Sequence, residues 1–237
     1  MSPTSVVVLT GAGISADSGV ATFRGAGGLW EGQRVEDVAT PEAWVRQPDV
    51  VWRFYQKRRA ALASVEPNAA HVALAEFAGA LAERGVDFTL ISQNVDDLHQ
   101  RAGSVVLSMH GALERLRCEA CGAVIHDLER FDPEAFIACE ACGFERLRPD
   151  IVWFGELPRH LDAIEDALGR CTHFVAVGTS GEVYPAAGFL HEARLRGAET
   201  WIVSLEPPSN RHPEDRYVGG RAAEVLPGLC SEWLAAW

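Results

Sequence analysis

Residues 11–30, GAGISADSGVATFRGAGGLW, decide the fold, because they follow an apolar run and are rich in glycine. The apolar run, residues 5–10 (SVVVLT), predicts a buried parallel strand. Gly11 and Gly13 let the backbone turn sharply and approach a ligand closely. Ser15 is expected to cap a short helix that has an acidic residue in its first turn. A strand, a glycine turn and a helix N-terminus together predict a site for a phosphate group.

The second half of this stretch differs from a dehydrogenase site. The Gly-x-Gly-x-x-Ala pattern alone is a weak signal, because a tight turn without a ligand fits it equally well. No strand follows directly, so no acidic residue closes a standard βαβ unit about 20 residues on. Instead, Thr22, Phe23, Arg24 and Trp30 lie in a glycine-rich loop that can close over a ligand and exclude water. We therefore expect a nucleotide site that serves chemistry other than hydride transfer.

The composition describes an ordinary soluble protein with an acidic balance. The chain has 237 residues and a formal net charge of −12, which indicates one large domain or a domain with an inserted module. The acidic balance argues against nucleic acid as a partner and weakly favours cationic, lysine-bearing substrates. No apolar run approaches the roughly 18 residues of a transmembrane helix, and no signal peptide fits the N-terminus. We expect a cytoplasmic protein with no membrane partner.

Four of the six cysteines form two Cys-x-x-Cys pairs with 17 residues between them. In a reducing compartment this spacing predicts a zinc ribbon rather than two disulfides. A glycine directly follows each pair, so two tight turns can bring four thiolates to one tetrahedral ion. Four thiolates leave no open coordination position, so the zinc would be structural. The predicted ligands are Cys118, Cys121, Cys139 and Cys142, whereas Cys171 and Cys230 are expected to pack as small apolar groups.

Strands and helices alternate along the rest of the chain. Helices are expected from Pro41 to Pro48 and over residues 48–64, 69–84, 159–169, 186–196 and 227–237. Asn68 is expected to cap the helix over residues 69–84, and His71 on that helix is expected to be a packing or capping residue rather than a ligand. Strands are expected over residues 86–92, 105–109, 173–177 and 200–205, and residues 207–216 are expected to form a surface loop. This alternation predicts an α/β fold with a doubly wound parallel sheet, interrupted by the cysteine module.

Small or polar residues follow five of the expected strands, where ligands bind in a doubly wound sheet. Because His110 follows one of these strands and unperturbed imidazole titrates near pH 6.5, it is the best candidate for a general base. Ser180 lacks the Gly-x-Ser-x-Gly context, which argues against a Ser–His–Asp hydrolase. The residues at the strand ends are Gly11, Ala12, Gly13, Gln93, Asn94, Val95, Asp96, His110, Gly178, Thr179, Ser180, Ser204, Leu205 and Glu206.

The helix expected at residues 48–64 has an arginine on its apolar face. Val51, Tyr55, Arg58 and Leu62 lie at positions i, i+4, i+7 and i+11 of this helix, so they share one face. One interpretation is that Arg58 belongs to a solvated basic run, residues 57–59, that complements the helix C-terminus. The other is that Arg58 is a functional side chain. The residues alone leave both interpretations open.

Taken together, the motifs resemble the sirtuin family of NAD-dependent protein-lysine deacylases. They are GAGISADSG, TFRG, QNVDDLH, MHG, the two CxxC pairs, VWFGE and GTS, in that order along nearly the whole chain. The resemblance implies a Rossmann-like NAD-binding domain over residues 1–33, 85–110 and 149–237. It also implies a smaller inserted domain with a helical part, residues 34–84, and a zinc ribbon, residues 111–148. Acylated lysine side chains of proteins would enter the cleft between the two.

The resemblance also implies NAD as a consumed co-substrate, one structural Zn²⁺ and a role for each matching residue. His110 would accept the proton, and Asn94 and Asp96 would act beside it. The matching NAD contacts are Gly11, Ala12, Gly13, Ser15, Thr22, Phe23, Arg24, Trp30, Gln93, Asn94, Val95, Asp96, Gly178, Thr179, Ser180, Ser204, Leu205, Glu206 and Ala222. Val152, Trp153, Phe154 and Gly155 would pair with the substrate backbone as an added strand. Ser204 departs from the family, which usually has Asn there, so we expect a weaker adenosine contact.

The sequence further resembles a subclass that removes negatively charged acyl groups. Tyr55 and Arg58 match the Tyr-x-x-Arg motif of that subclass, and Ala39 matches a small residue that widens the acyl channel. This implies that Arg58 binds an acyl carboxylate. It also implies that acetyl, succinyl and malonyl groups are removed, with nicotinamide and O-acyl-ADP-ribose as products. The short N-terminus resembles bacterial or archaeal members.

Two other functions remain open at this level. Protein mono-ADP-ribosyl transfer would use the same NAD site with another acceptor. A zinc-ribbon module that senses NAD without turnover is the third interpretation, and the combination of Asn94, Asp96 and His110 argues against it. The sequence does not indicate the protein substrates or the oligomeric state.

Overall fold

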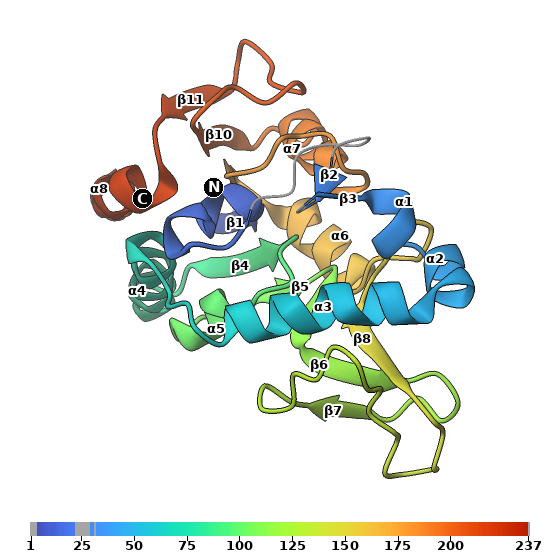
Figure 1. Ribbon diagram of the computed structural model, residues 1–237. Helices are drawn as coiled ribbons and strands as arrows, with labels where there is room; N and C mark the ends of the chain where they lie inside the picture. The colour runs from blue at the N-terminus through green and yellow to red at the C-terminus, as the bar shows by residue number, and fades with distance from the viewer. Residues whose placement is uncertain (1–3, 22–28, 31, 237) are drawn as a thin grey trace.

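The computed structural model describes residues 4–21, 29–30 and 32–236. A six-stranded sheet forms its centre, with the order β11-β10-β9-β1-β4-β5 and parallel pairing throughout (Figure 1). After β1 the chain continues to β4 on one side and later to β9 on the other, so the strand order reverses at β1 and β9. The strands are β1 (Ser5–Thr10), β4 (Asp87–Ser92), β5 (Leu107–Ser108), β9 (His173–Val177), β10 (Glu199–Ser204) and β11 (Arg216–Gly219). This confirms the predicted doubly wound sheet.

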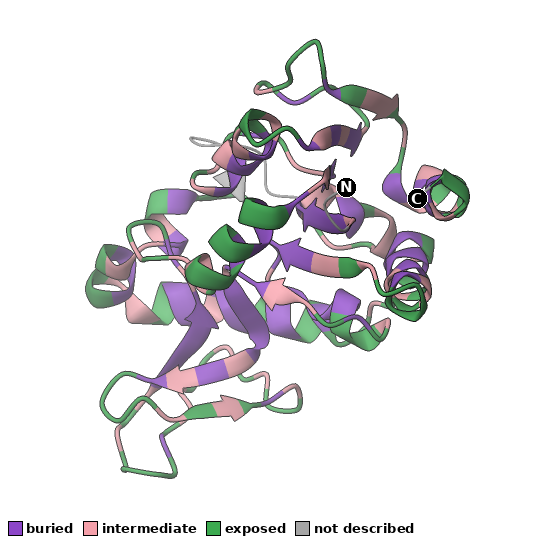
Figure 2. Ribbon diagram, turned by 180° about the vertical axis from the view of Figure 1, so that it is seen from behind, coloured by how far each residue is buried: buried purple, intermediate pink, exposed green. Residues whose placement is uncertain are grey.

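Helices cover both faces of the sheet, and β1 shows how the faces divide. Val6 and Val8 contribute to the core under α4 and α8, whereas Val7 and Leu9 contribute to the core under α6 and α7. Figure 2 shows the central strands buried and the outer helix surfaces exposed. No helix in the described ranges has the length and apolar character needed to cross a membrane. The helices are α4 (Ala69–Glu83), α6 (Leu161–Arg170), α7 (Ala186–Leu195) and α8 (Ala222–Ala236).

The N-terminus of α4 follows the sequence prediction and connects this helix to the loop after β1. The Asn68 side chain accepts a hydrogen bond from the Ala70 N–H, and the His71 ring accepts one from the Asn68 N–H. These bonds form a capping box. The Asn68 amide also donates to the Ile14 carbonyl at 2.8 Å. One cap residue therefore starts the helix and fixes the loop beside it, as expected for a capping rather than a ligating His71.

A second core joins the remaining helices to a three-stranded antiparallel sheet. The Trp52 indole of α3 donates to the carbonyls of Asp132 and Ala135 in the cysteine module. Trp52 lies in one apolar cluster with Leu116 of β6 and with Trp44. The helical part and the cysteine module therefore pack as one unit, with α1 and α2 at the right of Figure 1 and the cysteine module at the bottom, below α3. Its elements are α1 (Val35–Val38), α2 (Pro41–Arg46), α3 (Pro48–Leu62), β6 (Gly111–Cys118), β7 (Val124–His126) and β8 (Leu147–Ile151).

Several element boundaries differ from the sequence prediction. The C-terminal helix α8 begins at Ala222 and includes Pro227, instead of starting at that proline. Its residues Ala222, Leu226 and Trp233 are buried, so packing outweighs the local cost of the proline. The loop predicted to end at residue 216 gives way there to strand β11, while β5 is shorter than expected. The short elements β2 (Leu29–Trp30), β3 (Gln33–Arg34) and α5 (Leu98–Arg101) were not predicted.

Candidate active site

The carboxyl ends of β1 and β9 meet at a junction made of glycines. The Gly11 N–H donates to the Val177 carbonyl and the Gly13 N–H to the Gly178 carbonyl, each at 2.9 Å. A Cβ added to Gly13 would lie 2.7 Å from the Gly178 Cα, which is closer than real side chains approach. Glycine is therefore required at position 13 by close contact between two loops. This junction lies where the strand order reverses, the place at which such sheets bind ligands.

The segment after Gly13 corrects the prediction for Ser15. Two short 3₁₀ helices, η1 (Ala12–Ile14) and η2 (Ala16–Ser18), replace the single expected helix, and the Ser15 side chain caps neither. Its buried hydroxyl instead donates to the Asp96 carboxylate at 2.9 Å. Charge-assisted hydrogen bonds to a carboxylate are stronger than neutral ones, so the hydroxyl group is oriented toward the loop after β4 rather than toward the backbone of a helix. Ser15 thereby joins the loop after β1 to the loop after β4.

Backbone donors, rather than a helix end, are available for a phosphate at this junction. A three-residue 3₁₀ helix is too short for the helix-terminus argument made from the sequence. However, the N–H groups of Ala12, Thr179 and Ser180 have no hydrogen-bond acceptor among the described residues. Successive free N–H groups beside small residues are the donor type that binds phosphates in nucleotide sites. The junction therefore fits the diphosphate of a dinucleotide.

The loop after β4 holds three strand ends together through amide side chains. The Gln93 amide donates to the Thr179 hydroxyl at 3.1 Å. The Asn94 amide donates to the Gly11 carbonyl at 3.2 Å and to the Ser15 hydroxyl at 3.1 Å. The predicted residues after β1, β4 and β9 are thus connected side chain by side chain. In addition, the Val95 carbonyl accepts the Leu113 N–H of β6 at 2.7 Å, which connects this loop to the second core.

Asp96 lies at the buried centre of this group. Burial raises the pKa of its carboxyl group, while the Ser15 hydrogen bond and the more distant Arg58 charge act in the opposite direction. Its second oxygen accepts the Leu98 N–H, at the first turn of α5. Both oxygens are thus used to hold backbone and side chain in place.

The His110 ring is held in one tautomer by a backbone carbonyl. Its Nδ1 lies 2.8 Å from the Gln93 carbonyl oxygen, which can only accept, so Nδ1 carries the hydrogen. The other nitrogen, Nε2, is then left as a proton acceptor. Burial lowers the pKa of His110, and the bond to Gln93 partly opposes this shift. The ring is therefore neutral at pH 7, as a general base must be.

The predicted adenosine side lies at the ends of β9 and β10. The Ser204 hydroxyl donates to the Glu206 carbonyl at 2.7 Å, so this serine closes its own loop. The Tyr217 hydroxyl donates to the carbonyls of Ser204 and Leu205, which holds the loop from the other side. Ser180, Leu205 and Glu206 are exposed, and Ala222 is the buried first residue of α8. Thr22, Phe23 and Arg24 lie outside the described residues, and Trp30 is described only by its backbone in β2.

The stretch predicted to pair with substrate already uses three successive N–H groups inside the chain. The Val152 N–H donates to the His110 carbonyl and the Phe154 N–H to the Ala39 carbonyl. Between them, the Trp153 N–H donates to the Glu156 carboxylate at 2.8 Å. These bonds place the stretch directly beside His110 and Ala39. A peptide that pairs here would therefore have to donate to carbonyl groups.

Tyr55 and Arg58 are both buried on α3, with 0% and 7% of their surface exposed. Arg58 is therefore not part of a solvated run, although its neighbour Lys57 is exposed. The Tyr55 hydroxyl accepts a hydrogen bond from the Trp153 indole at 3.0 Å. Burial raises the pKa of Tyr55, and the Trp153 bond and the Arg58 charge act against this shift. Tyr55 of the predicted acyl-binding pair thus contacts the predicted substrate stretch.

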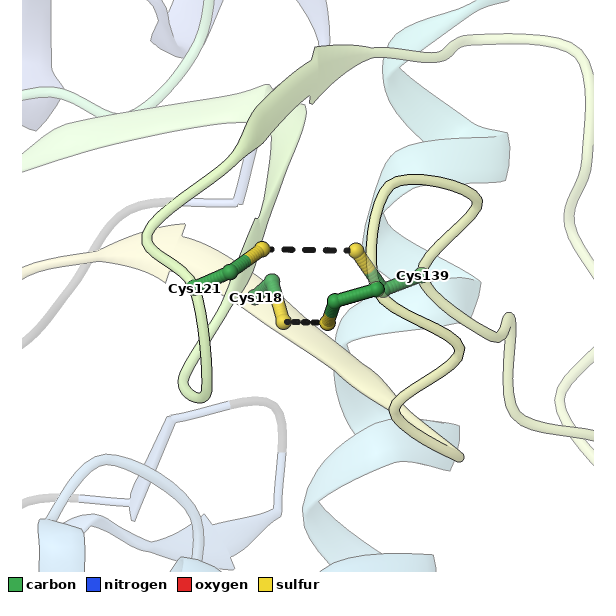
Figure 3. Close-up of side chains that lie close together, drawn as sticks. Cys118, Cys121 and Cys139 are labelled. Atoms are coloured by element: carbon green, nitrogen blue, oxygen red, sulfur yellow. Dashed lines mark hydrogen bonds between the residues drawn. The ribbon is translucent and has the colours of Figure 1, made fainter.

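The four predicted zinc ligands form a compact cluster of sulfur atoms. The Sγ atoms of Cys118 and Cys142 are 3.7 Å apart, as are those of Cys121 and Cys139, and all four lie within 4.8 Å of one another. Figure 3 shows Cys118, Cys121 and Cys139 pointing toward a common centre from two loops. A tetrahedral ion with Zn–S bonds of about 2.3 Å has sulfur atoms about 3.8 Å apart. The cluster fits a structural zinc ion.

Arg59 is a structural residue that the sequence analysis missed. Its guanidinium is fully buried and donates to the carbonyls of Leu113 and Asp127, beside the Asp127 carboxylate. It therefore joins α3 to the cysteine module, one residue away from Arg58. A signal was present in the sequence: Arg59 lies eight residues after Val51, a spacing that returns to the same helix face.

The comparisons with known proteins agree with this geometry. Residues 11–185 match the model of the Sir2 family. The chain belongs to the Sir2 family. It is 50% identical over 233 residues to the NAD-dependent protein deacylase SIR2rp3 of Trypanosoma brucei brucei, covering 97% of this chain and 94% of that protein. It is 48% identical over 232 residues to the NAD-dependent protein deacylase of Caulobacter vibrioides, covering 97% of each.

Solved Sir2 structures show the same fold. A Sir2 homolog–NAD complex superposes with a TM-score of 0.86 at 36% identity, covering 99% of this chain and 91% of that one. Sir2Af2 bound to a myristoylated histone peptide superposes with a TM-score of 0.75 at 33% identity, covering 97% and 91%. The Rossmann-like fold of this Sir2 protein is therefore that of its family.

Proposed function

We propose that this Sir2 protein removes acetyl, succinyl and malonyl groups from protein lysines, consumes NAD and gives nicotinamide and O-acyl-ADP-ribose. The observation that carries the proposal is His110. Its Nδ1 is fixed by the Gln93 carbonyl, and the same glutamine bonds to Thr179 at the glycine junction. A neutral base is thus connected to the dinucleotide site by one residue. The names of the relatives support deacylation and do not favour mono-ADP-ribosyl transfer.

The dinucleotide would lie along the strand ends, with its diphosphate at Ala12, Thr179 and Ser180. When bound, NAD supplies a ribose carbon whose leaving group is nicotinamide. Asn94 and Asp96 hold the adjoining loop, because each bonds to Ser15. The loop after β4 is thus held in place before NAD binds. A fixed loop keeps the reacting groups in position and keeps water out of the site. The loop with Thr22, Phe23, Arg24 and Trp30 would complete the NAD contacts, together with Ser204, Leu205, Glu206 and Ala222.

His110 would take up a proton at Nε2 during acyl transfer. The bond from Nδ1 to Gln93 keeps the ring oriented and stabilises the imidazolium that forms. Because burial lowers the pKa of His110, the ring is ready to accept at neutral pH. It also returns the proton readily once the reaction is complete.

Tyr55 and Arg58 would bind the distal carboxylate of succinyl or malonyl groups. The two residues are one helical turn apart and both are buried. A guanidinium keeps its charge and can donate two parallel hydrogen bonds to a carboxylate. The small Ala39 is buried beside Phe154 and leaves room for the acyl chain. An acetyl group would occupy the same channel but has no carboxylate to bind the Arg58 guanidinium.

The substrate would enter between two parts of the molecule. We assign residues 1–33, 85–110 and 149–237 to the NAD-binding part. Residues 34–84 and 111–148 would form the smaller part, in which α1 to α3 and the zinc ribbon share one core, whereas α4 packs on the central sheet. Val152, Trp153, Phe154 and Gly155 lie at the boundary and would pair with the substrate backbone through their carbonyl groups.

The acyl assignment is tested by replacing Arg58 with methionine. A charge-assisted hydrogen bond contributes about 1.5–3 kcal/mol, so the succinyl-to-acetyl ratio of kcat/KM should fall at least about tenfold in Arg58→Met. Arg53→Met is the matched control, because Arg53 lies on the same helix but is exposed and paired with Glu134. An equal ratio in wild type, Arg53→Met and Arg58→Met would contradict the acyl assignment and leave deacylation untouched.

A further inference from the structure

The indole of Trp153 lies between a buried cation and the Tyr55 hydroxyl. The Arg148 guanidinium carbon is 3.5 Å from the centre of the Trp153 ring, which is direct cation–π stacking. On its edge, the indole N–H donates to the Tyr55 hydroxyl at 3.0 Å. Trp153 and Tyr55 are at most 2% exposed, so no water competes for this bond. A cation on the ring face draws electron density from the indole and strengthens its N–H as a donor.

One carboxylate holds both the backbone and the ring of Trp153. Glu156 accepts two hydrogen bonds from Arg148, at 2.8 and 2.9 Å, and also accepts the Trp153 N–H at 2.8 Å. Arg148 itself is only 3% exposed. On the remaining side, Trp44 packs against Trp153 with ring centres 5.9 Å apart. The indole therefore has a single available orientation.

This orientation determines where the Tyr55 hydroxyl hydrogen points. A phenolic O–H stays close to the ring plane, so it has two preferred directions, one on each side of the oxygen. The Trp153 N–H occupies one side and requires an acceptor there, so the hydroxyl hydrogen must point away from the indole. Arg58 follows Tyr55 by one turn of α3, and its charge acts on the phenol. The phenol therefore donates in one fixed direction, on the side of its oxygen that faces away from the indole.

We propose that Trp153 is a positioning residue for acyl-chain selectivity, because its indole N–H sets the Tyr55 hydroxyl as a donor to the carboxylate of the acyl group. The inference rests on the proposed function of Tyr55 and Arg58. It adds that the side chain of a residue in the substrate stretch, and not only its backbone, determines which acyl groups are accepted. Phenylalanine at position 153 would keep an aromatic ring for Arg148 and lose the N–H.

The test compares wild type with Trp153→Phe, Tyr55→Phe and the double variant, using the same peptide with succinyl-lysine or acetyl-lysine. Loss of one buried hydrogen bond predicts a succinyl-to-acetyl ratio of kcat/KM that is about three- to tenfold lower in Trp153→Phe, mainly through KM for the succinyl peptide. If Trp153 acts through Tyr55, Trp153→Phe should cause no further change of the ratio in the Tyr55→Phe background. Trp52→Phe is the matched control, because it removes buried indole hydrogen bonds, to the carbonyls of Asp132 and Ala135, in the same core, and the Trp52 ring packs on Phe136.

The outcomes separate the two claims. An unchanged ratio in Trp153→Phe, with a lowered ratio in Tyr55→Phe, would overturn the positioning role and leave the acyl assignment intact. Additive effects in the double variant, or an equal drop of the ratio in Trp52→Phe, would also overturn it, since both indicate general loosening of the core. An unchanged ratio in Tyr55→Phe would contradict the proposed acyl site itself, and the positioning role with it.

Discussion

Three histidines beside the loops of the site, His71, His99 and His110, are kept neutral by burial. Burial lowers the pKa of His71 to about 4 and that of His99 to about 3. Their rings pack edge to face with centres 4.8 Å apart, and His99 lies 3.1 Å from the Thr10 hydroxyl at the end of β1. A proton on either ring would place a charge under the site. His110 therefore predicts a pH dependence of activity, and His99 predicts one of stability.

His110 predicts the acidic limb of the pH–activity profile. As a general base it must be neutral, and burial places its pKa below the usual 6.5, so kcat/KM should stay constant down to a pH below that value and then fall. The measurement is kcat/KM for an acetyl-lysine peptide between pH 5 and 8. An acidic limb centred at or above about pH 7 would contradict the neutral, carbonyl-fixed ring. His110→Ala should lower turnover by roughly two orders of magnitude or more.

His99 predicts a loss of stability in mild acid. The unfolded chain takes up a proton at this residue below about pH 6.5, whereas the folded chain does so only near pH 3. Protonation therefore favours unfolding as the pH falls, by about 1.4 kcal/mol per unit below 6.5. The free energy of unfolding at pH 7.5 and 5.5, from denaturant titration, should fall by about 1 kcal/mol less in His99→Gln than in wild type. The same decrease in both proteins would show that His99 is charged in the fold.

At the scale of secondary structure, the site depends on how closely the loops after β1 and β9 approach. Gly11 and Gly13 are bonded to Val177 and Gly178, and Asn94 closes the same junction from the loop after β4. These are contacts between segments that are more than 80 residues apart in the chain. The loops therefore hold their shape only when the whole sheet has formed.

Gly13→Ala tests this junction. The added Cβ would lie 2.7 Å from the Gly178 backbone, which cannot move without disturbing β9, so we expect a loss of about 1–3 kcal/mol in stability and weaker binding of NAD. The measurements are thermal unfolding and calorimetric titration with NAD. Gly79→Ala is the control, because its Cβ would meet nothing within 4 Å on an exposed part of α4. Wild-type stability and NAD affinity in Gly13→Ala would show that the loops are not in close contact.

Local signals in the sequence were sufficient for much of this architecture. Apolar runs located β1, β4, β9 and β10, the Asn68 cap located the start of α4, and the cysteine spacing located the metal cluster. Each of these signals depends on neighbours within a few residues. The strand-end rule then brought Gln93, His110 and Thr179 together before their contacts were known.

The errors concern residues whose state is set by distant partners. Serine is a common helix-capping residue, but the Ser15 hydroxyl donates instead to the Asp96 carboxylate in another loop. Arg59 sits in a basic run, yet Asp127 and Leu113 provide a buried site for its charge. Pro227 has the features of a helix start, but packing of Ala222 and Leu226 extends the helix before it. The partners of Ser15 and Arg59, and the residues against which Ala222 and Leu226 pack, are distant in the sequence.

At the scale of the whole molecule, the zinc ribbon and the acyl pocket belong to one core. Trp52 bonds to the ribbon backbone, and Arg59 joins α3 to Asp127 of the ribbon. Tyr55 lies on α3 with Trp52 and Arg59, and it belongs to the same apolar cluster as Cys118 and Cys139. The metal site therefore supports the pocket without contacting the reacting groups.

Loss of zinc should consequently unfold the smaller part and abolish activity indirectly. Structural zinc contributes about 10–16 kcal/mol in small ribbons, against a total stability of about 5–15 kcal/mol for a domain. We expect Cys118→Ala to lower the melting temperature, expose α3 to proteolysis and remove deacylase activity. Cys171→Ala, at a buried thiol outside the cluster, should cost far less. A metal-free Cys118→Ala protein that is well folded and fully active would rule out this structural role.

The central claim is that the chain uses NAD to remove an acyl group from lysine. It is tested most directly by mass spectrometry of an acetyl-lysine and a succinyl-lysine peptide incubated with the protein, with and without NAD. We expect deacylated peptide, nicotinamide and O-acyl-ADP-ribose in equal amounts with NAD, no reaction without it, and turnover at least about a hundredfold lower with His110→Ala. Deacylation at the same rate without NAD, or ADP-ribose attached to the protein in place of a small acylated product, would contradict the claim.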